Sequence, residues 1–152
     1  MQQCDFELNN QPLTQFKIGA MSFPAFSGLG HYVNKRIFAC VPDLGPIPPG
    51  TYFILDRQSG GFLGPLWDSI KGHKDWFALY ANDGRIDDKT YCNHIERGNF
   101  RLHPKMGLGI SKGCITIENI GHFNQIRMLL KSNKPTKIVG TDLLTYGTVL
   151  VR

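Results

Sequence analysis

Glycine and proline interrupt this chain so often that it must be built from short segments. The 152 residues include 17 glycines and 9 prolines, and between them lie short runs rich in Phe, Tyr, Val, Ile and Thr. Such runs, bounded by turn residues, are typical of β-strands. Hydrophobic residues make up 41% and charged residues 19%, which is the composition of a folded domain. The pattern therefore predicts a mainly β fold (β-rich α+β) in a single domain spanning residues 1–152.

The expected strands are distributed along the whole chain. Apolar and polar residues alternate on either side of Asn9 and Asn10, which predicts a hairpin. Further strand-like segments lie at residues 20–26, 36–41, 51–57, 75–81, 99–103, 114–118, 136–140 and 146–152. One convincing helix is expected, with Asn119 as its cap and apolar residues at helical spacing up to Lys131.

The charge pattern favours an ordinary solvated surface. The net charge is +5, but Lys and Arg are spread along the chain without a block of like charges. We therefore expect no nucleic-acid partner, although a basic module that binds an anionic polymer remains the non-enzymatic alternative. No stretch approaches the ~20 apolar residues of a membrane span. The N-terminus lacks a basic region followed by an apolar core, so we expect no signal peptide and synthesis in the cytoplasm.

The cysteines and histidines do not have metal-ligand spacing. The four cysteines form no CxxC pair, and the histidines outside the motif below have no ligand spacing relative to one another. We therefore expect no metal and no cofactor. A chain made in a reducing compartment has free thiols at synthesis, and later disulfide pairing is left open. The residues concerned are Cys4, Cys40, Cys92, Cys114, His31, His73, His94 and His122.

One stretch, "RLHPKMGLGISKGCITIE", has the features of a nucleophilic site. If its two strand-like ends are adjacent in a sheet, His103 can face Cys114 and act as the base that a cysteine nucleophile needs. Gly113 and the other glycines of the stretch let a substrate approach backbone N–H groups, which can form an oxyanion hole. Ser111 could orient the imidazole, the third role in a triad. The alternative is that Cys114 is a buried structural thiol.

Four other residues are candidates for substrate binding. Arg101 could pair with a carboxylate in a bidentate manner, or form a surface salt bridge. Arg57 and Ser59 follow a strand and could form the wall of a groove, although a plain loop is equally compatible. Trp67, like Trp76, could line a groove, but packing is the commoner role of large aromatic residues.

Several motifs together resemble a known family. The segments "FRLHP" and "GISKGCITI" resemble the active-site motif of L,D-transpeptidases, and "GPIPPGTYFI" resembles an upstream strand of that family. With "FSGLG" and "WFALY", the set is similar to the type VI secretion L,D-transpeptidase effectors, small antibacterial toxins of Gram-negative bacteria. The resemblance covers about residues 26–130. Lys112 and Thr116 stand where the housekeeping enzymes have His and Arg, and the His-to-Cys gap is shorter, which fits the effector branch.

The resemblance implies a fold and a reaction. It implies an L,D-transpeptidase-like β-sandwich with one main helix after the cysteine strand. It makes Cys114 the nucleophile and His103 its base, with Ser111 and Gly113 in the motif turn. Cys114 would attack tetrapeptide stems at meso-diaminopimelate, and the thioester would pass to water or an amine, without a metal or an organic cofactor.

The resemblance also implies partners and a place of action. The partners would be peptidoglycan stem peptides, a cognate immunity protein and the type VI secretion machinery, and the protein would act in the periplasm of target Gram-negative cells. The rival enzyme class is a papain-like cell-wall amidase. Those enzymes place the cysteine at the start of a helix and before the histidine, whereas here His103 precedes Cys114.

Overall fold

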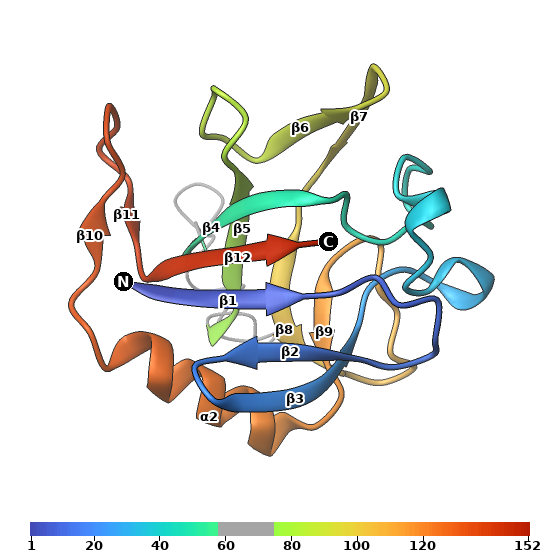
Figure 1. Cartoon of the computed structure of the whole chain (residues 1–152), viewed down its shortest axis with the longest axis horizontal. Coiled ribbons are helices and arrows are strands. Elements are labelled where there is room, and N and C mark those ends of the chain that lie inside the picture. The colour runs from blue at the N-terminus through green and yellow to red at the C-terminus, as the bar shows by residue number, and fades with distance from the viewer. Residues whose placement is uncertain (58–74) are drawn as a thin grey trace.

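The two ends of the chain pair with each other. In the computed structural model, which describes residues 1–57 and 75–152, β1 (Gln2–Phe6) runs parallel to β12 (Gly147–Val151). Among the described residues this pairing closes a barrel with the strand order β1-β12-β4-β5-β8-β9-β3-β2 (Figure 1). The mainly β class with one main helix is confirmed. The sheet closes on itself, where the resemblance implied a sandwich, because the terminal strands satisfy each other's edges.

The remaining elements fall into three groups. The other barrel strands are β2 (Thr14–Ile18), β3 (Met21–Phe26), β4 (Gly50–Asp56), β5 (Phe77–Ala81), β8 (Arg101–Pro104) and β9 (Ile115–Ile117). Outside the barrel, β6 (Lys89–Cys92) pairs with β7 (Ile95–Gly98), and β10 (Thr136–Lys137) pairs with β11 (Leu144–Thr145). The helical elements are the 3-10 turns η1 (Gly30–Tyr32) and η2 (Arg36–Phe38) and the helix α2 (Ile120–Lys131).

Alternating side chains fill the barrel. In β2, Thr14, Phe16 and Ile18 are buried while the residues between them are exposed, which is the period of a strand with one face on the core. Burying a side chain of this size stabilises the fold by about 1.5–3 kcal/mol. Helix α2 lies below the barrel in Figure 1, and its buried face joins the same core through Phe123, Ile126 and Leu130.

Two local predictions are confirmed. The side chain of Asn119 accepts hydrogen bonds from the backbone N–H groups of Gly121 and His122, and so it caps α2 at the predicted position. The N-terminal hairpin also forms, because β1 and β2 pair antiparallel. The loop between them holds Asn10 at φ +62°, a conformation that asparagine tolerates better than most residues. In the described residues, no helix is long and apolar enough to cross a membrane.

The strand predicted over residues 36–41 is wrong. Arg36–Phe38 forms a 3-10 turn and Ile37 is 84% exposed. The carbonyl of Ala39 accepts a hydrogen bond from Arg97, and Cys40 forms a disulfide with Cys92. These two attachments hold the segment against the β6–β7 hairpin, so it is not free to join a sheet. The disulfide answers the pairing question left open by the sequence, and Cys4 and Cys114 are free thiols.

Candidate active site

The two motif strands are parallel neighbours in the barrel. His103 on β8 lies opposite Thr116 on β9, and Leu102 lies opposite Ile115. Leu102 and Ile115 are fully buried in the core. Because successive side chains of a strand point to opposite faces, His103 lies on the face of β8 opposite the core, and Cys114 directly precedes β9. The prediction that these segments form adjacent strands is confirmed.

His103 and Cys114 line one cleft of about 800 Å³. Arg57, Trp76, Asn99 and Arg101 line the same cleft. The loop between β8 and β9 contributes another wall through Met106, Leu108, Ile110 and Lys112. The cleft therefore places a thiol, an imidazole and two guanidinium groups around one space that is large enough for a peptide substrate.

The contacts of His103 favour one tautomer. Its Nδ1 lies 2.7 Å from the carbonyl oxygen of Pro104. A carbonyl oxygen can only accept a hydrogen bond, so Nδ1 carries the proton and Nε2 is left as the basic nitrogen. The Thr116 hydroxyl lies 3.5 Å from Nε2. The ring is 94% buried and stacks on Trp76, with centroids 4.3 Å apart and 20° between the planes.

Burial and nearby charges act on the pKa of the Cys114 thiol in opposite directions. Burial is the largest effect and raises its pKa. The backbone N–H of Arg101 and the charges of Arg101 and Arg57 lower it, while Asp88 raises it. The net direction is upward, so the thiolate must form when a substrate is attacked. A raised thiol pKa increases the benefit of a general base, the role that Nε2 of His103 can fill. The Cys114 thiol donates to the Asn99 carbonyl at 3.7 Å.

Ser111 fixes the backbone of the motif turn. Its hydroxyl donates to the Cys114 carbonyl at 2.8 Å and accepts from the Gly28 N–H at 3.2 Å. The side chain is buried, with 1% exposed. The Pro104 carbonyl occupies the position at Nδ1 of His103 that we considered for Ser111.

Gly113 is required for both conformation and space. Its φ is +110°, and a Cβ built there would lie 2.6 Å from Nη2 of Arg97 and 2.7 Å from Cε1 of Phe100. The N–H groups of Gly113 and Cys114 have no hydrogen-bond acceptor within the described part of the chain. Two consecutive donors therefore remain available beside the nucleophile.

The substrate-binding candidates have different surroundings. The guanidinium of Arg101 forms a bidentate ion pair with Asp88, at 2.8 and 2.7 Å, and lines the cleft. The guanidinium carbon of Arg57 lies 5.6 Å from the Trp76 ring centroid, also in the cleft. Ser59 and Trp67 lie outside the described residues.

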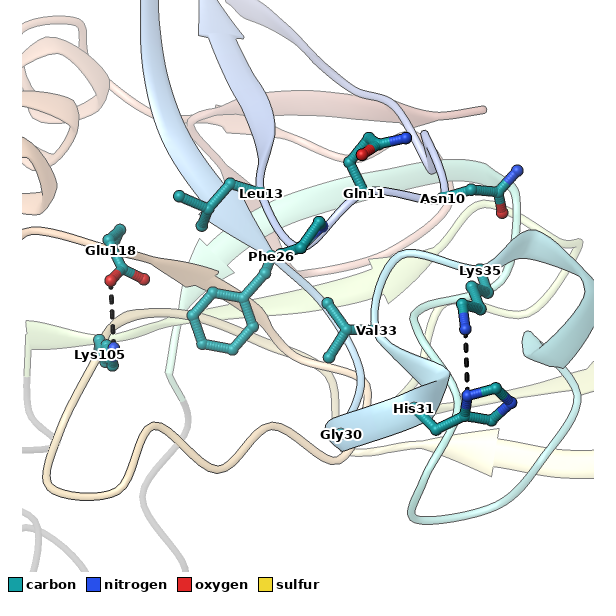
Figure 2. A pocket seen from close by; sticks show the side chains of 11 residues that line it. Asn10, Gln11, Leu13, Phe26, Gly30, His31, Val33, Lys35, Lys105 and Glu118 are labelled. Atoms are coloured by element: carbon teal, nitrogen blue, oxygen red, sulfur yellow. Dashed lines mark hydrogen bonds and ion pairs between the residues drawn. The ribbon is translucent and has the colours of Figure 1, made fainter.

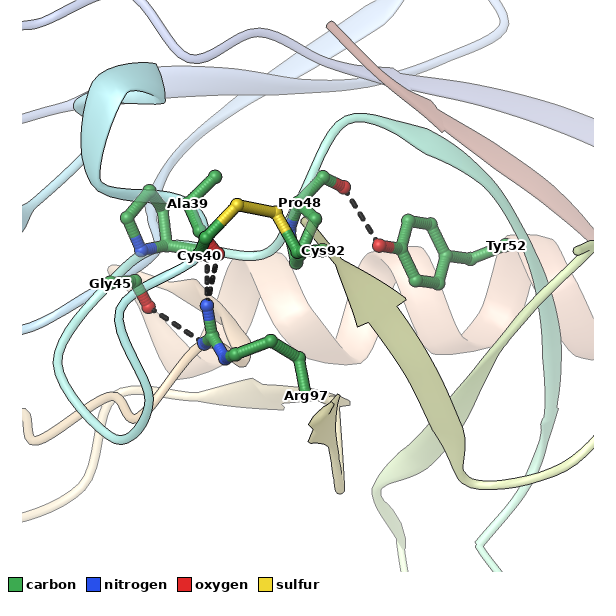
Figure 3. The surroundings of a disulfide bond; sticks show 8 residues. Ala39, Cys40, Gly45, Pro48, Tyr52, Cys92 and Arg97 are labelled. Atoms are coloured by element: carbon green, nitrogen blue, oxygen red, sulfur yellow. Dashed lines mark hydrogen bonds between the residues drawn. A yellow bond between two sulfur atoms is a disulfide. The ribbon is translucent and has the colours of Figure 1, made fainter. Parts of the chain in front are cut away.

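Sequence reasoning missed two residues next to the site. The sequence predicts chiefly a packing role for Trp76, but its ring stacks on His103 in the cleft. Arg97 was not singled out, yet it is 96% buried and its guanidinium donates to the carbonyls of Ala39, Gly45 and Pro46 beside the Cys40–Cys92 disulfide (Figure 3). The sequence around Arg97 gives no indication that this residue is buried, because the segment has the pattern of an exposed hairpin.

A second cleft of about 510 Å³ lies elsewhere on the molecule (Figure 2). Leu13, Phe26 and Val33 form an apolar wall, and the Lys105–Glu118 ion pair closes one side at 3.1 Å. Neither Cys114 nor His103 lines it. In the described part of the chain, no three His, Cys, Asp or Glu residues are grouped to hold a metal. The described free thiol that lines a cleft together with a histidine is therefore that of Cys114.

Comparison with known proteins identifies the family of the chain. A model of the Tlde1 domain family matches residues 21–141 of the chain. No curated protein and no solved structure matches the chain. The matched range contains β8, β9 and the turn between them, and hence every described residue of the cleft. The chain therefore belongs to the Tlde1 domain family, the type VI secretion L,D-transpeptidase effectors.

Proposed function

We propose that this protein is a cysteine L,D-carboxypeptidase and L,D-transpeptidase that acts on the tetrapeptide stems of peptidoglycan. One observation carries the proposal: Cys114 and His103 line one cleft from two adjacent parallel strands. A thiol whose pKa burial raises, in one cleft with an imidazole whose Nδ1 faces a carbonyl oxygen, is suited to acyl transfer through a thioester.

The reaction begins at the amide bond between meso-diaminopimelate and the terminal D-alanine. The Cys114 sulfur attacks the carbonyl carbon while Nε2 of His103 takes the thiol proton. The C–N bond then breaks, and the imidazolium gives this proton to the amine of the leaving D-alanine. Water attacks the thioester carbonyl in the carboxypeptidase reaction, and the amine of a D-amino acid attacks it in the exchange reaction. Nε2 of His103 takes a proton from the attacking group and gives it to the Cys114 sulfur as the C–S bond breaks. In both cases the Cys114 thiol is regenerated.

The backbone beside the nucleophile supports this mechanism. The developing oxyanion needs hydrogen-bond donors that are already oriented, and one such donor is worth about 10²–10³ in kcat in other enzymes. The N–H groups of Gly113 and Cys114 are the candidates, since no acceptor in the described residues uses them. Trp76 holds the imidazole plane by stacking, which restricts the direction of the proton transfer.

We further propose that the protein is delivered by the type VI secretion machinery to the periplasm of Gram-negative competitors, and that a cognate immunity protein protects the producer. Family membership supports this delivery. The alternative of a papain-like amidase has less support, because Cys114 is followed by strand β9 and not by a helix.

Mass spectrometry of purified tetrapeptide muropeptides tests the function. The parent protein should release D-alanine, and added D-amino acid should appear in the product. Cys114→Ala should abolish both reactions while Cys4→Ala, which changes the other free thiol, should retain them. A basic binding module would bind sacculi with a steep dependence on salt and release nothing. Release at the parent rate by well-folded Cys114→Ala protein would refute the mechanism.

The two motif side chains should also behave as a unit. His103→Ala should lose nearly as much activity as Cys114→Ala. The double variant should be scarcely worse than Cys114→Ala, because groups that act in one step are strongly non-additive. Independent, additive losses would contradict the roles assigned to this pair.

A further inference from the structure

Two buried side chains hold the carbonyl oxygens that immediately precede Cys114. Nη2 of Arg97 donates to the Lys112 carbonyl at 3.5 Å, and the hydroxyl of Ser27 donates to the Gly113 carbonyl at 3.1 Å. Arg97 is 4% exposed and Ser27 is fully buried. Both carbonyl oxygens are therefore directed toward the protein interior.

The orientation of these carbonyls determines where two N–H groups point. A trans peptide unit is planar, and its C=O and N–H bonds point in opposite directions. The described residues contain no cis peptide bond. The N–H groups of Gly113 and Cys114 belong to the peptide units whose carbonyls Arg97 and Ser27 hold, so these N–H groups point away from the interior.

The guanidinium of Arg97 is itself held by a rigid set of backbone acceptors. It donates to the carbonyls of Gly45 at 3.1 Å and Pro46 at 3.2 Å and to that of Ala39 (Figure 3). Its guanidinium carbon lies 5.4 Å from the Phe100 ring centroid. The Cys40–Cys92 disulfide ties the same loop to the β6–β7 hairpin that carries Arg97. Gly113 rests directly against this guanidinium, since a Cβ would lie 2.6 Å from Nη2.

Ser27 holds the second of these two carbonyls, that of Gly113. Its hydroxyl accepts from the Ile47 N–H at 2.8 Å while it donates to Gly113. Its backbone N–H donates to the Asn34 side chain at 2.9 Å, and its carbonyl accepts from the Asn34 N–H at 2.8 Å. Neither Ser27 nor Arg97 lines the cleft of Cys114, so any effect on chemistry must pass through the turn.

The geometry points to Arg97 and Ser27 as positioning residues that orient the oxyanion hole formed by the N–H groups of Gly113 and Cys114. This inference rests on the proposed acyl transfer. Neither residue touches the reacting atoms. They hold the two peptide units before the nucleophile, so that both donors face the carbonyl oxygen as its negative charge develops.

Two variants test this assignment. Arg97→Lys keeps the charge but loses the planar set of donors that reaches several carbonyls at once, and Ser27→Ala removes one hydroxyl. Arg85→Lys and Ser22→Ala are the matched controls, because both positions are exposed. For each protein, kcat and KM for D-alanine release are measured together with the rate at which iodoacetamide alkylates Cys114.

The alkylation rate separates positioning from general damage. Iodoacetamide reacts by displacement at a saturated carbon and forms no oxyanion. Its rate therefore reports the reactivity of the Cys114 thiol and does not depend on an oxyanion hole. Both variants should lose about 10–100-fold in kcat, a part of what removal of a donor costs. KM should stay close to that of the controls, and the alkylation rate should stay unchanged.

Two results would refute the positioning role of Arg97 and Ser27. If kcat stays at the level of the controls, or if alkylation falls in step with kcat, the positioning role is refuted while the proposed function stands. If the parent protein releases no D-alanine, the proposed function fails and this inference fails with it. If Arg97→Lys does not fold, as judged by its thermal melt, Ser27→Ala decides the question.

Discussion

Arg101 and Cys114 are electrostatic partners at the start of two parallel strands. The backbone N–H and the guanidinium charge of Arg101 both lower the pKa of the Cys114 thiol, in opposition to the burial that raises it. The guanidinium is also paired with Asp88 at 2.7 Å. The reactivity of the thiol therefore depends on a balance between its burial and the charge of Arg101.

The rate at which iodoacetamide alkylates Cys114 should depend on the pKa that this balance sets. Only the thiolate reacts, so the rate should rise with pH toward a midpoint above that of an ordinary thiol. Arg101→Gln should move the midpoint higher, because the charge that lowers the pKa is lost and Asp88 remains. Burial, followed by the charge of Asp5, raises the pKa of Cys4 to about 12, so Cys4 should label last.

Peptide mapping across neutral to alkaline pH provides this measurement. Arg85→Gln is the control, because Arg85 is exposed and does not act on the thiol. Faster labelling of Cys4 than of Cys114, or a downward shift of the midpoint in Arg101→Gln, would contradict the electrostatic account.

Gly113→Ala should destabilise the protein and abolish D-alanine release. The left-handed backbone costs a non-glycine residue about 1–2 kcal/mol, and overpacking against Arg97 and Phe100 costs about 1–3 kcal/mol more. Gly140→Ala is the matched control, since Gly140 has φ +79° but no heavy atom lies within 4 Å of a Cβ built there. Gly140→Ala should lose only the stability that the left-handed backbone costs, about 1–2 kcal/mol, and it should keep its activity. Urea unfolding measures the difference, and equal losses in both variants would be inconsistent with this packing.

The Cys40–Cys92 disulfide should contribute strongly to stability. It joins residues 52 positions apart, for which the chain-entropy relation gives about 4 kcal/mol. Reductant should lower the melting temperature of the parent and of Cys4→Ala, but not that of the Cys40→Ser, Cys92→Ser double variant. A parent melt that does not respond to reductant would argue against the bond's stabilising role.

Toxicity should depend on the compartment. A version fused to an export signal should inhibit growth of a Gram-negative host, because mature peptidoglycan lies outside the cytoplasmic membrane. The same protein without the signal should be harmless, as should exported Cys114→Ala. Growth curves with matched expression levels provide the comparison, and equal toxicity in the two compartments would rule out a cell-wall target.

Local signals predicted much of the fold and part of the site. The Asn119 cap and the apolar spacing of α2 depend on residues within a few positions of each other, and this helix is confirmed. The alternating residues around His103 and Cys114 likewise predicted two strands, which the structure places side by side. Each of these patterns is complete within a short window of sequence.

Contacts between residues that are far apart in the sequence could not be predicted from such local patterns. Arg97 lies 52 residues from Gly45 in sequence, and in "HIERGN" it has the pattern of a surface charge. Only folding brings several carbonyls around its guanidinium. Barrel closure similarly depends on pairing β1 with β12 across nearly the whole chain, and strand-like segments alone do not specify their partners.

The place of β12 between β1 and β4 also bears on how the nascent chain folds. Until residues 147–151 have left the ribosome, β1 and β4 each lack the neighbour that β12 provides. The ring of strands can therefore close only after β12 has been synthesised, and such non-local pairing is intrinsically slow. During that interval the growing polypeptide has two unpaired strand edges, on β1 and on β4, and unpaired edges are templates for pairing with another chain.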